Sequence, residues 1–278
     1  MKTLIQKASG ELVPFSSSKF RESLVRSGAE DVIIDQIVRE IEVWISGQDV
    51  IPSNQIYARA FSMLRKMTTS NAARYKLKTA MMELGPTGHP FEHFVGEIYR
   101  SLGYDVKVSE ILDGHCVTHE VDVIATKGNH QRFIECKYYQ STGKNANVQV
   151  PLYIRSRVDD IIAKRKTASG FENFTFSGGV VTNTRFTSDA EAYGKCSGLF
   201  LMSWDFPIGN SLKDIIDRER IFPVTSLSNL TYVQKQALME KGIVICRQIL
   251  KDPSVLDSLS LGNVKYRKVM DELKALAG

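Results

Sequence analysis

The 278-residue sequence has few cysteines, and they lie far apart. Cys116, Cys136, Cys196 and Cys246 form no CxxC pair, so we expect neither a zinc site built on paired thiolates nor a disulfide framework. This cysteine usage is typical of a reducing compartment. No apolar run approaches the ~18 residues needed to cross a bilayer, and the start lacks the apolar segment of a secretory signal. We therefore expect a cytoplasmic protein with no membrane partner.

Two common catalytic motifs are also missing. The sequence has no GxxxxGK[ST] loop, which argues against a motor-type ATPase. It has no HExxH motif either, although His89 and His93, like His115 and His119, are four residues apart. The first pair brackets a proline and the second lies in a strand or loop, so a histidine zinc site is disfavoured. A formal charge of +5 permits binding of a polyanion but is too small to demonstrate it.

The chain divides into three sections with different predicted secondary structure. We therefore interpret it as an α/β multidomain protein. The boundaries fall near the Gly85-Pro86 turn and near residue 222, giving domains at 1–85, 86–222 and 223–278. The first predicts a β-hairpin around Ser9-Gly10, followed by four amphipathic helices. The second predicts a helix over 91–102 and then strands mixed with helices, which indicates a mixed sheet flanked by helices. The third predicts a small all-α domain.

The pattern that carries chemistry lies in the second section. Asp122 follows Val121, and Glu135 and Lys137 follow Phe133 after a turn at 127–130. The two runs are therefore expected to be adjacent antiparallel strands. Side chains alternate along a strand, so Glu135 and Lys137 share one face. If Asp122 points to that face, two carboxylates and an ammonium group converge.

Such a group suits phosphodiester hydrolysis. Asp122 and Glu135 are expected to be the metal ligands, because a pair of carboxylates with waters and substrate phosphate suits Mg²⁺, or Mn²⁺ in its place. The Cys136 carbonyl is a possible further oxygen ligand. The metal would activate a bound water, and Lys137 would orient or help deprotonate that water. An acid and a base two residues apart on a strand are also common as a solvated surface pair, so the pattern alone has low specificity. The apolar residues around it favour a site, because unpaired charge at the edge of a core is costly.

The order of motifs around these residues resembles the Mrr-like branch of the PD-(D/E)xK nucleases. The resemblance covers about 90–217 and includes Phe91-Glu92, Leu102-Gly103-Tyr104, Glu120 to Ala125, Glu135-Cys136-Lys137 and Gly179 to Thr187. It implies a restriction-endonuclease-like core that cleaves double-stranded DNA with Mg²⁺, with Lys137 as the catalytic lysine. Glu92 is then the expected extra acid of the first helix, with Glu97 as the alternative. Glu120, where relatives often have glycine, is either a second ligand or a surface acid.

A helix starting near Gln149 is expected to touch DNA. Some nucleases of this superfamily carry a Q-x-x-x-Y element there, and Gln149 and Tyr153 share one helix face. A surface glutamine and a core tyrosine are an equally good interpretation. The most basic stretch of the chain follows and would suit phosphate contacts, although a solvated helix face is the simpler alternative. Its members are Arg155, Arg157, Lys164, Arg165 and Lys166.

The first section resembles the ATP-cone, a regulatory nucleotide-binding module with a hairpin lid over a helical bundle. The residues that carry the resemblance are Ile5 to Glu11, Pro14 to Lys19, the helix after Pro52-Ser53, and Arg74-Tyr75-Lys76. The resemblance implies binding of ATP or dATP as an allosteric ligand, through Lys7, Lys19, Ser53, Tyr57 and Lys76 (or Arg74). Ala8 stands where many members have arginine, which weakens the expected phosphate affinity. A degenerate domain that binds only a partner is the alternative.

The last section resembles helix-hairpin-helix domains, which bind DNA phosphates through backbone amides. A packing or dimerisation domain, and hence a homo-oligomer, is an equally good interpretation. Taken together, the sequence predicts a Mg²⁺-dependent DNA endonuclease regulated by ATP or dATP. The alternative is a nucleotide-sensing DNA-binding or regulatory protein with an inactive nuclease core.

Overall fold

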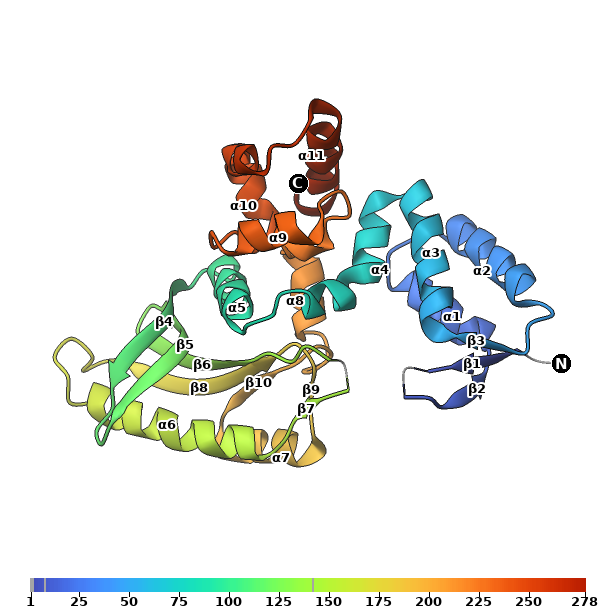
Figure 1. Cartoon of the computed structure of the whole chain (residues 1–278). Coiled ribbons are helices and arrows are strands. Elements are labelled where there is room, and N and C mark those ends of the chain that lie inside the picture. The colour runs from blue at the N-terminus through green and yellow to red at the C-terminus, as the bar shows by residue number, and fades with distance from the viewer. Residues whose placement is uncertain (1–2, 8, 142) are drawn as a thin grey trace.

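The computed structural model describes residues 3–7, 9–141 and 143–278, except for the side chains of Thr69 and Ser70. Ala8, which replaces the arginine found in many ATP-cone domains, lies outside these residues. Figure 1 shows an N-terminal helical body, a central sheet with helices on both faces, and a C-terminal helical body above the centre. Across the described ranges, no helix is both long and apolar enough to cross a membrane.

The N-terminal body contains the expected hairpin and four helices, with one addition. Strands β1 (Leu4–Gln6) and β2 (Leu12–Pro14) pair antiparallel, and the unexpected strand β3 (Val50–Pro52) pairs parallel to β1. The helices are α1 (Ser17–Val25), α2 (Asp31–Ile45), α3 (Ser53–Met67) and α4 (Thr69–Met82). Helix α1 begins where Ser16 accepts a hydrogen bond from the Lys19 amide, the N-cap that its serine run predicts.

A five-stranded mixed sheet forms the centre, in the order β10-β8-β6-β5-β4. Its strands are β4 (Asp105–Asp113), β5 (Thr118–Lys127), β6 (His130–Lys137), β8 (Thr175–Thr182) and β10 (Phe200–Met202). Strands β4, β5 and β6 form an antiparallel meander, whereas β8 runs parallel to both β6 and β10. Two short strands, β7 (Asn145–Ala146) and β9 (Arg185–Phe186), pair beside it. The predicted mixed sheet is confirmed.

Helices cover both faces of this sheet (Figure 1). Helix α5 (His89–Ser101) lies on one face, and α6 (Gln149–Arg165) and α7 (Ser188–Ser197) lie on the other. The alternation of β6 divides its side chains between the two layers. Ile134 and Cys136 pack in the α5 layer, while Phe133 packs with Ile154 and Val158 of α6. Glu135 therefore faces α6.

The C-terminal body is built from helices, as expected, with one isolated β-bridge between Pro223 and Ile245. It follows α8 (Leu212–Arg218) and consists of α9 (Tyr232–Met239), α10 (Cys246–Lys251) and α11 (Asn263–Ala277). Two 3-10 segments, η1 (Val224–Ser226) and η2 (Pro253–Leu259), join them. Breaks fall at Gly242, Pro253 and Gly262, where the sequence has its turn residues.

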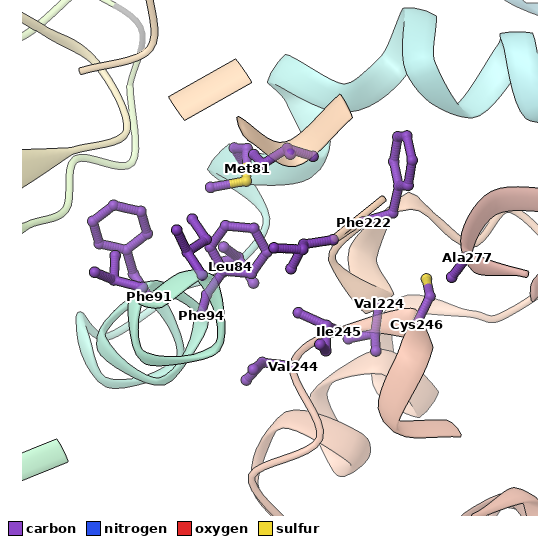
Figure 2. Packing of buried hydrophobic residues seen from close by; sticks show 14 of the residues in the cluster. Met81, Leu84, Phe91, Phe94, Phe222, Val224, Val244, Ile245, Cys246 and Ala277 are labelled. Atoms are coloured by element: carbon purple, nitrogen blue, oxygen red, sulfur yellow. The ribbon is translucent and has the colours of Figure 1, made fainter. Parts of the chain in front are cut away.

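One hydrophobic core unites the sheet layer of α5 with the C-terminal body. Figure 2 shows Met81 and Leu84 packed between Phe94 and the C-terminal side chains Phe222, Val224 and Ile245. Ala72 of α4 belongs instead to the separate N-terminal core, whereas the adjacent Ala73 already belongs to the central one. Helix α4 thus connects two cores, and its second half is part of the central one.

Candidate active site

The site forms where β5 separates from β6. The two strands pair from Lys127 and His130 as far as Val123 and Ile134. Beyond this point a side chain takes the place of the backbone pairing. Asp122 Oδ2 accepts a hydrogen bond from the Cys136 backbone N–H at 2.7 Å. This bond satisfies an amide that would otherwise be left without a partner, and it holds the Asp122 carboxylate beside Glu135.

Glu135 is held by two cations from different elements. Lys137 Nζ lies 3.1 Å from Glu135 Oε1, and Arg157 Nη1 of α6 lies 2.7 Å from Oε2. The Glu135 residue is 9% exposed. A nearly buried carboxylate needs such partners, because an unpaired charge in this position would be strongly destabilising.

Arg157 is itself fixed from three directions. Its guanidinium donates to the Glu120 carbonyl at 3.1 Å and to the Tyr153 hydroxyl at 3.0 Å, in addition to Glu135. It also lies over the Tyr153 ring at 4.8 Å. Tyr153 and Arg157 are four residues apart on α6, the spacing that brings two side chains together on a helix. The sequence suggested phosphate contacts or a solvated helix face for Arg157, and its four-residue spacing from Tyr153 was the signal for the contacts observed here.

The carboxylates influence each other strongly. Burial raises the pKa of Asp122 to about 7, and the neighbouring charge of Glu135 contributes in the same direction. Glu92 of α5 also raises it, whereas the Cys136 amide and Arg157 lower it. Negative charge is therefore concentrated in a partly desolvated place, which is the condition under which a divalent cation would be favoured.

The oxygen ligands available here suit a hard cation, but side chains would supply only some of them. Within the described part of the chain, no three His, Cys, Asp or Glu side chains are grouped closely enough to hold one metal ion. Asp122 and Glu135 would thus supply two oxygens, and water and substrate the others. Mg²⁺ commonly keeps several waters and takes only one or two protein carboxylates, so the two residues fit it.

The other acids suggested by the sequence occupy different places. Glu92 accepts from the Ser109 hydroxyl at 3.0 Å and lies 3.4 Å from His89, near enough to Asp122 to affect its pKa. Glu97 instead pairs with Arg100 at 2.7 Å. The Glu120 side chain is exposed. Of these acids, Glu92 is the one whose charge raises the pKa of Asp122.

Gln149 and the basic residues of helix α6 have different surroundings. Gln149 is exposed at its start and bonds with Asn147, not with either carboxylate. Arg155 pairs with Asp159 through an Nε–Oδ2 bond of 2.9 Å. Arg165 lies over Phe171, whereas Lys164 and Lys166 are exposed. Intramolecular carboxylates thus engage Arg155 and Arg157, and contact of the basic stretch with phosphates stays a prediction.

The residues expected to bind a nucleotide do not share one observed cavity. Lys7 pairs with Glu11 at 2.8 Å and Lys76 with Glu83 at 3.0 Å. Lys19 is exposed on the first turn of α1, and Ser53 begins α3. Tyr57 stacks on Tyr75 and lines a cavity with residues of other elements.

Comparisons with known proteins agree with this architecture. Residues 85–205 match a family model described as "Restriction endonuclease", and residues 222–277 match one described as "AF1548-like, C-terminal". A relative from Archaeoglobus fulgidus, named only as an uncharacterized protein, is 27% identical over 180 residues, which is 63% of this chain and 95% of the relative.

Two solved structures are similar. The crystal structure of AF1548, a protein of unknown function, has a TM-score of 0.56 and 25% identity, and covers 69% of this chain and 99% of that chain. The MspJI restriction endonuclease in complex with a 27-mer oligonucleotide has a TM-score of 0.31 and 16% identity over 52% of this chain and 31% of that chain, too remote to carry an argument. Residues 85–205 of this protein therefore form a restriction-endonuclease-like domain built on a mixed sheet.

Proposed function

We propose that the protein is a Mg²⁺-dependent endonuclease that hydrolyses phosphodiester bonds of double-stranded DNA. The observation that carries the proposal is the convergence of Asp122, Glu135 and Lys137 where β5 leaves β6, inside a restriction-endonuclease-like domain. The core is of the PD-(D/E)xK type in this proposal.

Each residue of the site has a separate role in this proposal. Asp122 and Glu135 would hold the metal, which would supply a water of lowered pKa and charge stabilisation at the phosphate when bound. Lys137, whose side chain is 41% exposed, extends from Glu135 toward solvent, where it can contact the water or the phosphate. Arg157 orients Glu135. Asp122 must release its proton before it binds a cation, because its pKa lies near neutrality.

DNA is the proposed partner because of the domain type and the exposed lysines at the end of α6. Lys164 and Lys166 are exposed on or next to the end of α6, the helix that carries Arg157. Contacts from lysines to backbone phosphates would give affinity without base readout, and the affinity would fall steeply with salt.

The decisive experiment measures plasmid cleavage with Mg²⁺, with Mn²⁺ and with EDTA. Lys137→Met should lose at least ~100-fold in rate, since it removes a cation from the reacting centre. Lys195→Met is the matched control, because Lys195 is an exposed lysine on α7 and not on β5, β6 or α6, the elements that carry the site. Full activity in Lys137→Met, or no metal-dependent cleavage in the native protein, would contradict the proposal. The second outcome would favour the alternative of a DNA-binding protein with an inactive core.

The regulatory part of the proposal is that ATP or dATP binds the N-terminal body through Lys7, Lys19, Ser53, Tyr57 and Lys76. It is supported by the β1–β2 hairpin beside α1 and α3, the arrangement that the resemblance implies. Lys7 and Lys76 would have to leave Glu11 and Glu83 to reach a phosphate. Calorimetry with ATP, dATP and ADP on the native chain and on Lys19→Ala tests it.

A further inference from the structure

A cavity of about 600 Å³ lies between the N-terminal body and the restriction-endonuclease-like domain. On one side it is lined by α1, α3 and α4, and on the other by β9, the segment after β10 and α8. Its volume is in the range of small-molecule sites, which span ~300–1,000 Å³. Both walls are made by elements far apart in the sequence, so the cavity exists only in the folded chain.

Positive charge exceeds negative charge in the lining. The five cations are Arg26, Arg74, Lys78, Arg185 and Lys213, and the three carboxylates are Asp205, Asp214 and Asp217. The carboxylates are already engaged. Arg185 Nε donates to Asp205 at 2.8 Å, Arg74 Nε lies 3.0 Å from Asp217, and Asp214 accepts from the Ser211 amide and hydroxyl at the start of α8.

Three cations therefore remain without a carboxylate. Arg26, Lys78 and Lys213 make no ion pair with any residue in the described ranges. Burial lowers the pKa of Lys78, and the charges of Arg185 and Lys213 lower it further against the opposite effect of Asp205. Like charges held together in a partly closed space are unfavourable, and a bound anion would relieve the repulsion.

We propose that this cavity binds a small polyphosphate-bearing ligand, held by Lys78 and Arg26 from the N-terminal body and by Lys213 from the central domain. Three unpaired cations would offset most of the charge of a triphosphate group, and lysines bind phosphate as point charges. The cavity shares Tyr57 and Arg74 with the nucleotide site expected from the sequence, but Arg26, Lys78 and Lys213 are not among the residues of that site. The inference goes beyond the proposed DNA cleavage and does not depend on it.

Because the cations come from both sides, the ligand would favour the observed arrangement of the two bodies over any more open one. A second cavity of about 440 Å³ shares Tyr57, Tyr75 and Lys78 with the first and is also lined by Gln140 and Ser141. These two residues follow Lys137 by three and four positions. Ligand at Lys78 is thus adjacent to the loop that leaves the candidate active site, which gives a physical route from binding to activity.

The test is calorimetry on the full chain in EDTA, with inorganic tripolyphosphate as the probe. We expect binding that weakens roughly tenfold in Lys78→Gln and in Lys213→Gln, since each loses a charged contact to phosphate. Lys241→Gln is the matched control, because Lys241 is exposed, lies in the C-terminal body and changes the net charge equally. The probe should also raise the melting temperature of the native chain but not that of Lys78→Gln.

Three outcomes of this titration would overturn the proposal. They are the absence of binding at millimolar probe, an equal loss in Lys241→Gln, and a loss in Lys19→Gln with none in Lys78→Gln. A parallel titration with ATP distinguishes a free polyphosphate from a nucleotide, and Lys78-dependent binding of either supports the site. If a short duplex oligonucleotide displaces the probe, the cavity holds a DNA phosphate and the small-ligand proposal is wrong.

Discussion

The Arg157 guanidinium lies 2.7 Å from one oxygen of Glu135, while Lys137 lies 3.1 Å from the other. Helix α6 thus places a fixed cation on a carboxylate that we propose as a metal ligand. A cation so close has two opposite consequences: it orients Glu135, and it repels an incoming divalent ion.

Arg157→Gln should separate these two effects. Loss of the positive charge should lower the Mg²⁺ concentration for half-maximal cleavage by a few-fold, while loss of the orienting contacts should lower the maximal rate. Titration of the cleavage rate with Mg²⁺ measures both quantities. Arg155→Gln, on the same helix but paired with Asp159, is the control and should change neither. A higher Mg²⁺ requirement in Arg157→Gln would show that the repulsive effect is unimportant.

Asp122→Asn should stabilise the metal-free protein above neutral pH. The folded state raises the pKa of Asp122 from 3.8 to about 7, so it binds more protons than the unfolded state between these values. Stability contributed by this group therefore falls as the pH rises from about 4 to about 7. Asparagine cannot ionise, so we expect a gain of roughly 1–2 kcal/mol near pH 8 and almost none near pH 4.

Thermal melts of native protein and Asp122→Asn in EDTA across this pH range measure the effect. Addition of Mg²⁺ should raise the melting temperature of the native protein more than that of the variant, since only the native site has both carboxylates. An Asp122→Asn variant that is less stable at high pH would show that its hydrogen bond to Cys136 outweighs the charge repulsion.

The stability that Asp160 contributes should increase with pH, whereas the contribution of Asp122 decreases. It accepts from His119 at 2.7 Å and from the Cys116 amide at 2.8 Å, and these bonds hold its pKa well below the usual range. A depressed carboxyl pKa contributes stability above the unfolded value of about 3.9 and loses it at lower pH. Asp160→Asn should therefore melt at a lower temperature than the native protein near pH 7. The difference should shrink below about pH 4, and a difference independent of pH would argue against the electrostatic cause.

Glu272 is a structural acid of the C-terminal body. It is 2% exposed and accepts four hydrogen bonds from Ser228 and Asn229, at 2.7 to 3.1 Å. Glu272→Ala leaves those buried donors without an acceptor, which should cost on the order of 3 kcal/mol or more. Urea unfolding measures the loss, and Glu272→Gln should recover part of it. A loss below ~1 kcal/mol would mean that water replaces the carboxylate.

Much of the fold follows from local patterns in the sequence. The alternation in β5 and β6 predicted adjacent strands and placed Glu135 and Lys137 on the face opposite Cys136, because a strand has a repeat of two. Ser16 predicted the start of α1, and the turn residues predicted the breaks of the C-terminal body. The short strand β3 was missed, since three residues that pair with β1 from far along the chain carry no periodic signal.

The sequence by itself determined the residue types of the candidate site, because Asp122, Glu135 and Lys137 lie close in the chain on neighbouring strands. The tertiary structure alone decided their partners. It brought Arg157 of α6 onto Glu135, replaced a strand pairing by the Asp122 bond to Cys136, and gathered Lys78 and Lys213 from different bodies around one cavity. Periodicity specifies which face of an element is buried, but partners from distant elements are fixed only when the layers pack.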